Sequence, residues 1–192
     1  VFEFLNKEFI DALSDYLSQR IGNIDTKENE ITTILEVGAG DGRLSHFIQQ
    51  KLIPKNQGKI KIIATDSGES RLKTHFPVEQ LDYKTAIKKY QPKIVICSWM
   101  PNGIDFSGFF RSTESIKEYI LIGEANGGCC GEEWYTWGSG PEEKHKDQKI
   151  PYEVDGFERI NLKEISQYQL SRLDNAGKYR RSSTVSFRRK KK

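Results

Sequence analysis

The first 24 residues place apolar side chains on one face of a predicted helix. These apolar positions are Leu5, Phe9, Ile10, Leu13, Tyr16, Leu17 and Ile21. Their spacing of three and four residues is typical of an amphipathic helix. Gly22 and the polar stretch over residues 25–30 then mark the end of the helix. We therefore expect residues 1–30 to form an N-terminal amphipathic helix that packs on the core.

Short β-branched runs alternate with helical patterns through the next hundred residues. The runs predict strands over residues 31–37, 59–65, 78–81, 93–98 and 118–123. The intervening patterns predict helices over residues 44–52, 70–75, 83–90 and 109–116. Strands that alternate with helices imply parallel pairing, with helices on both faces of one sheet. The pattern therefore predicts a three-layer α/β sandwich.

The pattern changes after Gly123. Residues 124–156 are rich in glycine and charge and show no sustained period, so we expect a long loop or lid there. Residues 167–173 and 182–188 alternate apolar and polar side chains around a turn at 174–177. They predict an antiparallel hairpin at the end of a mostly parallel sheet. Residues 31–192 are accordingly expected to form a single domain.

The composition fits one globular domain. The 192 residues are 36% hydrophobic and 30% charged, which suits a sizeable core. There is no run of 18 apolar residues and no signal-peptide pattern, so we expect a cytoplasmic protein that does not contact a membrane. The three cysteines include the adjacent pair Cys129 and Cys130, and they lack the spacing of a disulfide framework or a zinc site. We expect reduced thiols and no bound metal.

Most of the positive charge lies at the C-terminus. The formal net charge is +3, and the five residues of Arg188–Lys192 are all cationic. The rest of the chain is slightly acidic, which argues against an extended nucleic-acid-binding face. Two interpretations of the cationic end stay open: a nuclear-localisation or nucleic-acid patch, and a solvated tail.

The most informative segment is a glycine turn between the first predicted strand and the first helix of the α/β pattern. Gly38, Gly40 and Gly42 lie in this turn, where glycine allows positive φ and lets a ligand approach the backbone. The dinucleotide fingerprint G-x-G-x-x-G needs its last glycine at position 43, where this chain has Arg43. A pyrophosphate site, and with it a nicotinamide oxidoreductase, is therefore disfavoured.

With Glu36 two residues upstream, the turn resembles the first motif of the seven-strand S-adenosylmethionine-dependent methyltransferases. The resemblance extends over residues 31–188. It implies a Rossmann-like methyltransferase fold, in which a mostly parallel seven-stranded sheet ends in an antiparallel hairpin. It also implies that S-adenosylmethionine is the cofactor. The backbone of Gly38, Ala39 and Gly40 would approach its amino-acid portion, and Glu36 would lie near its ammonium group.

Further positions match the family residue by residue. Asp66 ends the second strand, where an acidic residue of the family accepts from both ribose hydroxyls. Asp82 matches the residue that accepts from the adenine amino group. Leu81 and Ser67 would flank the adenine ring.

The acceptor side of the predicted site begins at Ser98 and Trp99. The segment Ser98-Trp99-Met100-Pro101 has the position of the family's fourth motif, next to the transferred methyl group. It differs from the Asn/Asp-Pro-Pro-aromatic motif, which disfavours methylation of exocyclic base amines. Glu124 follows the fifth strand at the same edge of the sheet. We therefore expect Ser98, Trp99 and Glu124 to contact the acceptor or the transferred methyl group.

Two functions are compatible with the sequence. The first is a methyltransferase that acts on a small molecule or a protein, with acceptor and oligomeric state undefined by the sequence. The second is a catalytically inactive, methyltransferase-like interaction module whose contact surface is residues 124–156. A catalytic protein needs a path from Ser98 and Trp99 to solvent, whereas a module can fill this space with Trp134 or Trp137. Those two tryptophans either line a substrate pocket or anchor the long loop.

Overall fold

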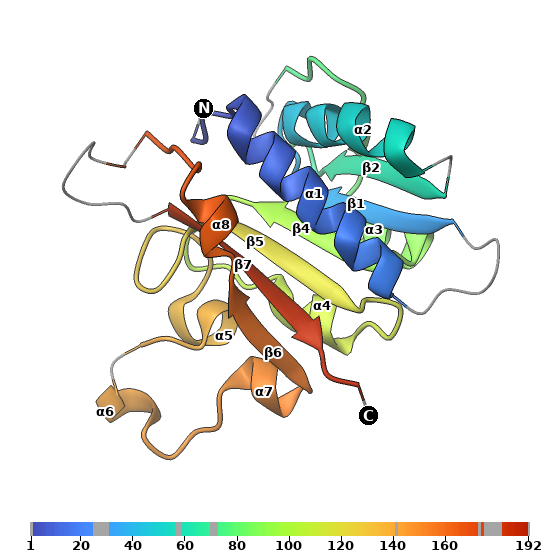
Figure 1. The fold of residues 1–192 in the computed structure, drawn as a ribbon. Helices are drawn as coiled ribbons and strands as arrows, with labels where there is room; N and C mark the ends of the chain where they lie inside the picture. Colours follow the sequence, from blue (N-terminus) through green and yellow to red (C-terminus); the bar gives the residue numbers. More distant parts are fainter. Residues whose placement is uncertain are drawn as a thin grey trace.

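The computed structural model describes residues 2–24, 31–56, 59–69, 73–140, 142–172, 174 and 182–191 (Figure 1). Within this part of the chain the strands form one seven-stranded sheet in the order β3-β2-β1-β4-β5-β7-β6. The strands are β1 Thr32–Val37, β2 Ile60–Asp66, β3 Glu79–Gln80, β4 Ile94–Ser98, β5 Glu118–Glu124, β6 Phe157–Asn161 and β7 Ser182–Arg189. Strands β1 to β5 pair in parallel, and β7 is antiparallel to both β5 and β6. The predicted three-layer α/β fold is confirmed.

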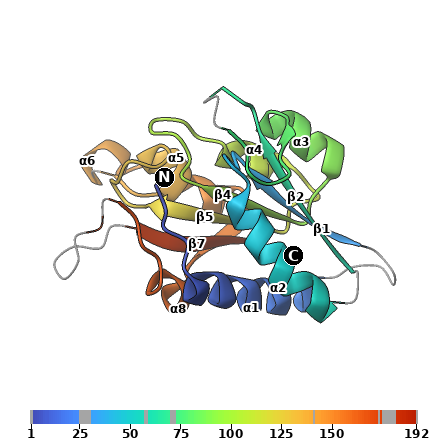
Figure 2. The same ribbon diagram turned by 90° about the horizontal axis from the view of Figure 1, so that it is seen from above.

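Helices cover both faces of the sheet (Figure 2). Helices α1 Lys7–Asn23, α2 Arg43–Asn56 and α8 Lys163–Ser166 lie on one face. Helices α3 Tyr83–Tyr90, α4 Ser107–Ser112, α5 Glu133–Trp137 and α7 Pro151–Val154 lie on the other. Successive strand residues such as Ile34 and Leu35 point to opposite faces and enter different apolar clusters. Because both faces are covered, the central strands are buried throughout.

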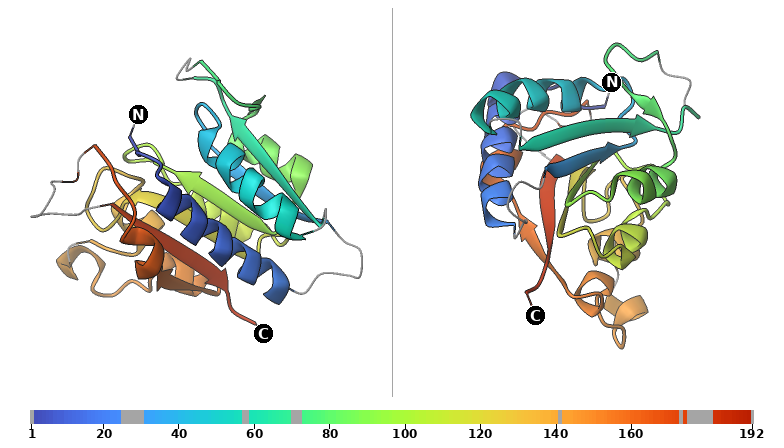
Figure 3. Two further views of the ribbon diagram at one scale, coloured as in Figure 1. Left: turned by 45° about the horizontal axis from the view of Figure 1, so that its top comes forward. Right: turned by 90° about the vertical axis from the view of Figure 1, so that its right-hand side faces the viewer.

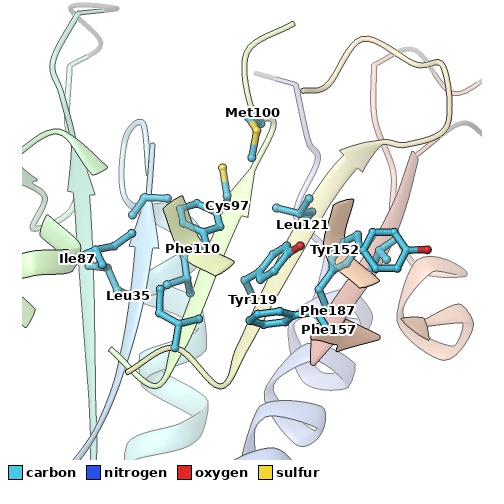
Figure 4. Close-up of a cluster of buried hydrophobic side chains, with 14 of the residues drawn as sticks. Leu35, Ile87, Cys97, Met100, Phe110, Tyr119, Leu121, Tyr152, Phe157 and Phe187 are labelled. Carbon is cyan, nitrogen blue, oxygen red and sulfur yellow. The ribbon is translucent and has the colours of Figure 1, made fainter. Parts of the chain in front are cut away.

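Aromatic side chains fill much of the cluster on the α3 and α4 face (Figure 4). The rings of Tyr119 and Phe187 are stacked, with centroids 4.6 Å apart. Phe110 meets Tyr119 edge to face, and Phe157 packs on the same ring. Large rings exclude water over a wide area, so this cluster joins the antiparallel strands to the parallel half of the sheet.

Helix α1 spans Lys7–Asn23 within the predicted range of residues 1–30, whereas residues 2–6 are not helical and residues 25–30 lie outside the described chain. The side chain of Asn6 caps it by accepting from the backbone nitrogen of Phe9 at 2.8 Å. Its apolar face packs on the sheet through Phe9, Ile10, Leu13 and Leu17, all of them buried. No helix in the described part of the chain is long and apolar enough to cross a membrane.

A buried carboxylate joins α1 to the antiparallel half of the sheet. Glu118 on β5 has no solvent exposure. It accepts from Arg20 Nε at 2.5 Å and from Ser186 Oγ at 2.6 Å, and the Tyr16 hydroxyl also donates to it. Arg188 Nε lies 3.7 Å from the same carboxylate. Burial raises the pKa of Tyr16 to about 12, so the phenol remains a donor at neutral pH.

The predicted hairpin is wrong in its first strand. The hairpin partner of β7 is β6, and of the described residues 167–172, which follow α8, Ser171 forms an isolated bridge with Glu3. Gln169 is buried there and accepts from Thr184 Oγ1 at 2.9 Å, so a side chain joins this segment to β7 in place of a strand ladder. Strand β6 escaped prediction because its burial is irregular and the chain has no clear alternation there. Most of the predicted turn at 174–177 lies outside the described residues.

The prediction of a long loop or lid at 124–156 is also wrong in part. This stretch contains the short helices α5, α6 Glu142–His145 and α7. Glu132 caps α5 by accepting from Tyr135 N at 2.5 Å, and Gly138 ends the helix with a φ of +66°. Helices this short depend on capping and tertiary contacts, which leave little periodic pattern.

Two smaller predictions are corrected as well. The helix expected over residues 109–116 is α4, which ends four residues earlier, at Ser112. Of the helix expected over residues 70–75, residues 70–72 lie outside the described chain and residues 73–75 are not helical. The third strand is only the two residues of β3, so among the described residues β2 has a partner on its outer side only at Thr65 and Asp66.

The cationic end is partly built into the sheet. Arg188 and Arg189 are the last residues of β7, and Arg188 Nη2 donates to the Tyr16 hydroxyl at 3.0 Å. Arg189 donates to the backbone oxygens of Arg111, Thr113 and Ile116, each at 2.9 Å. These two cations therefore belong to the fold, and the interpretation of the whole run as a solvated tail is wrong for them.

Candidate functional site

The glycine turn follows β1 at the carboxyl edge of the sheet (Figure 1). Gly38, Gly40 and Gly42 have φ values of +65°, +58° and +79°, which side chains other than glycine rarely adopt. A Cβ atom at Gly38 would meet nothing within 4 Å, whereas one at Gly42 would lie 2.6 Å from Val78 Cγ2. Gly38 therefore borders open space, and Gly42 allows the segment before β3 to pack on the turn.

Asp66 connects the end of β2 to the glycine turn. Its Oδ2 accepts from Gly40 N at 3.0 Å, and its Oδ1 accepts from Gly68 N at 2.8 Å. The backbone of Ala39 is fixed alongside, because its nitrogen donates to Thr65 O at 2.9 Å. A carboxylate oxygen can accept more than one hydrogen bond, so Asp66 keeps capacity for ligand hydroxyls.

Glu36 lies beneath the turn and is only 2% exposed. Its Oε2 accepts from Ser45 N at 3.0 Å and from Ser45 Oγ at 2.5 Å, so it holds the first turn of α2. Burial raises the pKa of Glu36 to about 7, although the two hydrogen bonds from Ser45 oppose this rise. Any effect of Glu36 on a bound ligand would therefore pass through the backbone of the turn.

Ser67, Leu81 and Asp82 lie beside Asp66 at the same edge. Leu81 N donates to Asp66 O at 2.9 Å, which brings the start of α3 next to the end of β2. Asp82 is the N-cap of α3, and its Oδ1 accepts from the backbone nitrogens of Lys84 and Thr85 at 2.9 and 3.1 Å. The cap role is compatible with a contact to an adenine amino group, which stays a prediction.

Ser98 is the last residue of the neighbouring strand β4, and Trp99 follows it. Trp99 has a φ of +58°, and its backbone nitrogen donates to Ile122 O at 2.7 Å. The ring of Trp99 stacks on Phe2, with centroids 5.3 Å apart. Its Nε1 donates to Glu3 Oε2 at 2.9 Å. An unusual backbone conformation therefore turns a large ring toward the N-terminal residues of the chain.

Glu3 is a site residue that the sequence did not indicate. It is 8% exposed and accepts from Gln169 Nε2 at 3.3 Å and from Leu170 N at 3.2 Å, in addition to Trp99. Desolvation raises its pKa to about 7, against the lowering effect of these donors. A single acidic residue before a helix carries no signal for such a role, because its partners lie 96 to 167 residues away in the sequence.

Glu124 is buried at the end of β5, with 2% exposure. Its Oε2 accepts from Cys129 N at 3.0 Å, and its backbone nitrogen donates to Cys130 Sγ at 3.3 Å. Its Oε1 has no hydrogen-bond partner among the described residues. Gly128 packs on the Cβ and the backbone of Glu124, so a Cβ atom at Gly128 would collide with them. A buried carboxylate oxygen without a donor is costly in a folded protein, so this atom is a candidate ligand contact.

The two tryptophans after β5 anchor their own segment. Trp137 is 2% exposed and donates from Nε1 to Cys130 O at 2.6 Å. The ring of Trp134 stacks on His145, with centroids 4.0 Å apart. The ring that lies against Trp99 is Phe2. These contacts favour the anchoring interpretation over a role in the substrate pocket.

A separate cavity of about 860 Å³ lies behind the turn, against the outer side of β2. Gly42 and Ser45 line one end of it, and Ile53, Lys61 and Phe76 are among its other walls. Among the described residues, no group of three or more His, Cys, Asp or Glu side chains is arranged to hold a metal ion.

Comparison with solved structures identifies the fold as the Rossmann-like methyltransferase fold. The structure of the DszA carbon methyltransferase aligns with a TM-score of 0.50 and 14% identity, over 94% of this chain and 52% of that one. The CurJ carbon methyltransferase aligns with a TM-score of 0.48 and 14% identity, over 91% and 53%. The human methyltransferase 10 domain containing protein aligns with a TM-score of 0.45 and 10% identity, over 97% of this chain and 85% of that one.

The chain thus spans about half the length of the two carbon methyltransferases. No protein-family model and no curated protein sequence matches it. At this level of identity the likeness establishes the fold, and the chemistry must be argued from the site.

Proposed function

We propose that this chain binds S-adenosylmethionine at the glycine turn and transfers its methyl group to an acceptor held next to Trp99. The observation that carries this proposal is the open space at Gly38, beside a carboxylate, Asp66, fixed 3.0 Å from Gly40 N. A flat, hydroxyl-bearing and cationic cofactor suits such a place, because glycine permits close approach and carboxylates accept from hydroxyls.

The residues divide between the two parts of the proposed site. The backbone of Gly38, Ala39 and Gly40 would hold the amino-acid portion of the cofactor, with Glu36 supporting the turn from beneath. Asp66 would bind the ribose. Ser67, Leu81 and Asp82 would border the adenine, and Ser98 would lie near the methyl group.

When bound, S-adenosylmethionine supplies a sulfonium methyl carbon that an acceptor lone pair attacks, and the electrons of the broken carbon–sulfur bond stay on sulfur. The protein has to align the acceptor, exclude water and receive any proton that the acceptor loses. Glu124 suits the last task, because its Oε1 is buried and has no described hydrogen-bond partner. Trp99 would form the wall against which the acceptor is positioned.

Calorimetric titration with S-adenosylhomocysteine tests the cofactor site, with Gly38→Ala and Gly156→Ala as a matched pair. Both glycines have positive φ, +65° and +78°, and a Cβ atom at either meets nothing within 4 Å. Both changes therefore introduce backbone strain of about 1–2 kcal/mol without a clash. Only Gly38 borders the proposed ligand, so affinity should fall in Gly38→Ala and persist in Gly156→Ala.

Two results would contradict the proposal. Equal affinity in both variants would show that the ligand does not approach Gly38. Failure of the folded wild-type chain to bind S-adenosylhomocysteine or S-adenosylmethionine would remove the proposed activity and favour a non-catalytic interaction module.

A further inference from the structure

The N-terminal arm, residues 2–6, crosses the acceptor side of the proposed site. It runs beside the segment that follows α8 (Figure 3). Phe4 N donates to Leu170 O at 2.8 Å, and Arg172 N donates to Phe2 O at 3.1 Å. Backbone hydrogen bonds therefore fix the arm, and the position of the Phe2 ring follows from them.

The Phe2 ring contacts two flat groups from distant parts of the chain. Its centroid lies 5.3 Å from that of Trp99, with 24° between the planes. The guanidinium carbon of Arg172 lies 4.3 Å from the same Phe2 centroid. Phe2 itself is 47% exposed, so burial contributes little to keeping this ring in place. We call the space that it occupies against Trp99 and Arg172 the Phe2 slot.

The Trp99 wall of the Phe2 slot is fixed before any ligand arrives. The indole of Trp99 is held by its hydrogen bond of 2.9 Å to Glu3, and Glu3 is itself held by Gln169 and Leu170. A preorganised aromatic wall binds a planar ring without first losing its own rotational freedom. The guanidinium of Arg172 can stack on that ring and also pair with a carboxylate.

We propose that the Phe2 slot binds a planar aromatic acceptor that carries an anionic group, with the acceptor ring taking the place of Phe2. This inference rests on the proposed function, because it makes Trp99 the acceptor wall next to the methyl group. The acceptor ring stacks on the Trp99 indole, and its anionic group lies against Arg172. Phe2 then acts as a built-in competitor that covers the indole in the ligand-free chain.

The test uses 4-hydroxybenzoate as the probe and trans-4-hydroxycyclohexanecarboxylate as its non-planar control. The indole N–H signals of the 192-residue chain are followed by ¹H–¹⁵N NMR during titration, and the Trp99 signal is assigned with Trp99→Phe. We expect 4-hydroxybenzoate to shift the Trp99 signal and the cyclohexane compound to leave it unchanged. Stacking requires a flat ring, so the comparison separates stacking from simple pairing of the carboxylate.

Variants of the arm supply the second readout. Phe2→Ala removes the competitor and should tighten binding of 4-hydroxybenzoate by about threefold to tenfold. Phe4→Ala removes a ring that is 53% exposed two residues further along the same arm, and it should leave the affinity unchanged. Arg172→Gln should weaken binding by about tenfold, because the carboxylate loses its charged partner.

Several outcomes would overturn the inference. These are the absence of a Trp99 shift in both the wild type and Phe2→Ala, an equal shift with the cyclohexane compound, and equal tightening by Phe4→Ala. The same samples are titrated with S-adenosylhomocysteine, so the two proposals can fail separately. If the chain binds 4-hydroxybenzoate at Trp99 but does not bind S-adenosylhomocysteine, the Phe2 slot is an aromatic-binding site. The proposed methyl transfer and the acceptor role are then both contradicted.

Discussion

The Asp66 carboxylate accepts a hydrogen bond of 3.0 Å from the backbone nitrogen of Gly40, across an interval of 26 residues. The end of β2 thereby fixes the shape of the turn that follows β1. The same carboxylate borders the space proposed for the cofactor ribose. In the proposed site, one side chain would therefore couple the geometry of the turn to ligand binding.

The first prediction concerns Asp66→Asn. An amide has one oxygen in place of two, so it cannot accept from Gly40 N and Gly68 N and still serve two ribose hydroxyls. We expect S-adenosylhomocysteine affinity to fall by about 1.5–3 kcal/mol, the range for hydrogen bonds to a charged group. Calorimetric titration measures this loss, with Asp147→Asn on an exposed turn as the control. An unchanged affinity in Asp66→Asn would remove the ribose assignment.

The second prediction concerns the pH dependence of stability. Glu36 has a pKa of about 7 in the folded chain against an ordinary value of 4.5. Between these values the folded state holds more protons than the unfolded state, so the free energy of unfolding falls as pH rises. The stability that protonated Glu36 contributes is fully present below about pH 4.5, and it is lost as the pH rises through about 7. Glu3, whose pKa is also about 7, acts in the same direction.

Glu36→Gln should therefore reduce the loss of stability across this pH window. The contribution of Glu36 is on the order of 3 kcal/mol, at about 1.4 kcal/mol per pKa unit. Urea unfolding at a series of pH values measures it, with the exposed Glu164→Gln as the control. A pH profile of Glu36→Gln that is identical to the wild-type profile would contradict the raised pKa.

The third prediction concerns the buried network at Glu118. Replacement by Gln removes the charge that faces Arg20, which donates to Glu118 at 2.5 Å, and leaves this cation beside the sheet without its partner. Breaking a buried ion pair in this way costs about 3–5 kcal/mol, so Glu118→Gln should lower the free energy of unfolding by that amount. Glu164→Gln should change it by less than about 0.5 kcal/mol. A loss of the same size in both variants would show that Glu118 does not hold α1 on the sheet.

The fourth prediction concerns the cysteines. Burial raises the pKa of Cys130 to about 12, and it also raises the pKa of the fully buried Cys97 thiol. The Cys129 thiol is half-buried, and burial followed by the Glu124 carboxylate raises its pKa as well. Since the thiolate is the reactive form, iodoacetamide should modify the native chain slowly, at Cys129 first. Peptide mass spectrometry measures the order in which the three cysteines are modified. Rapid labelling of Cys97 in the folded protein would contradict the prediction.

The strands and the glycine turn were predictable because their signals are local. The apolar runs of β1 and β4 are nearly continuous, since almost every residue of these two strands is buried. The turn needs glycine at Gly38 and Gly42 for reasons that act within a few residues. The roles given to Asp66 and to the other residues proposed to hold the cofactor came from the resemblance to the methyltransferase family. Local sequence therefore indicated the fold class and the glycine turn.

The sequence by itself thus determined the alternating α/β core, the N-terminal helix and the glycine turn at the carboxyl edge of the sheet. Only the tertiary structure decided that β6 is the partner of β7, and that Phe2 and Glu3 cover Trp99 from 96 or more residues away in the sequence. The reason is physical. Periodicity and turn chemistry depend on neighbouring residues. These contacts form only when folding brings residues that are distant in the sequence together and removes water from them.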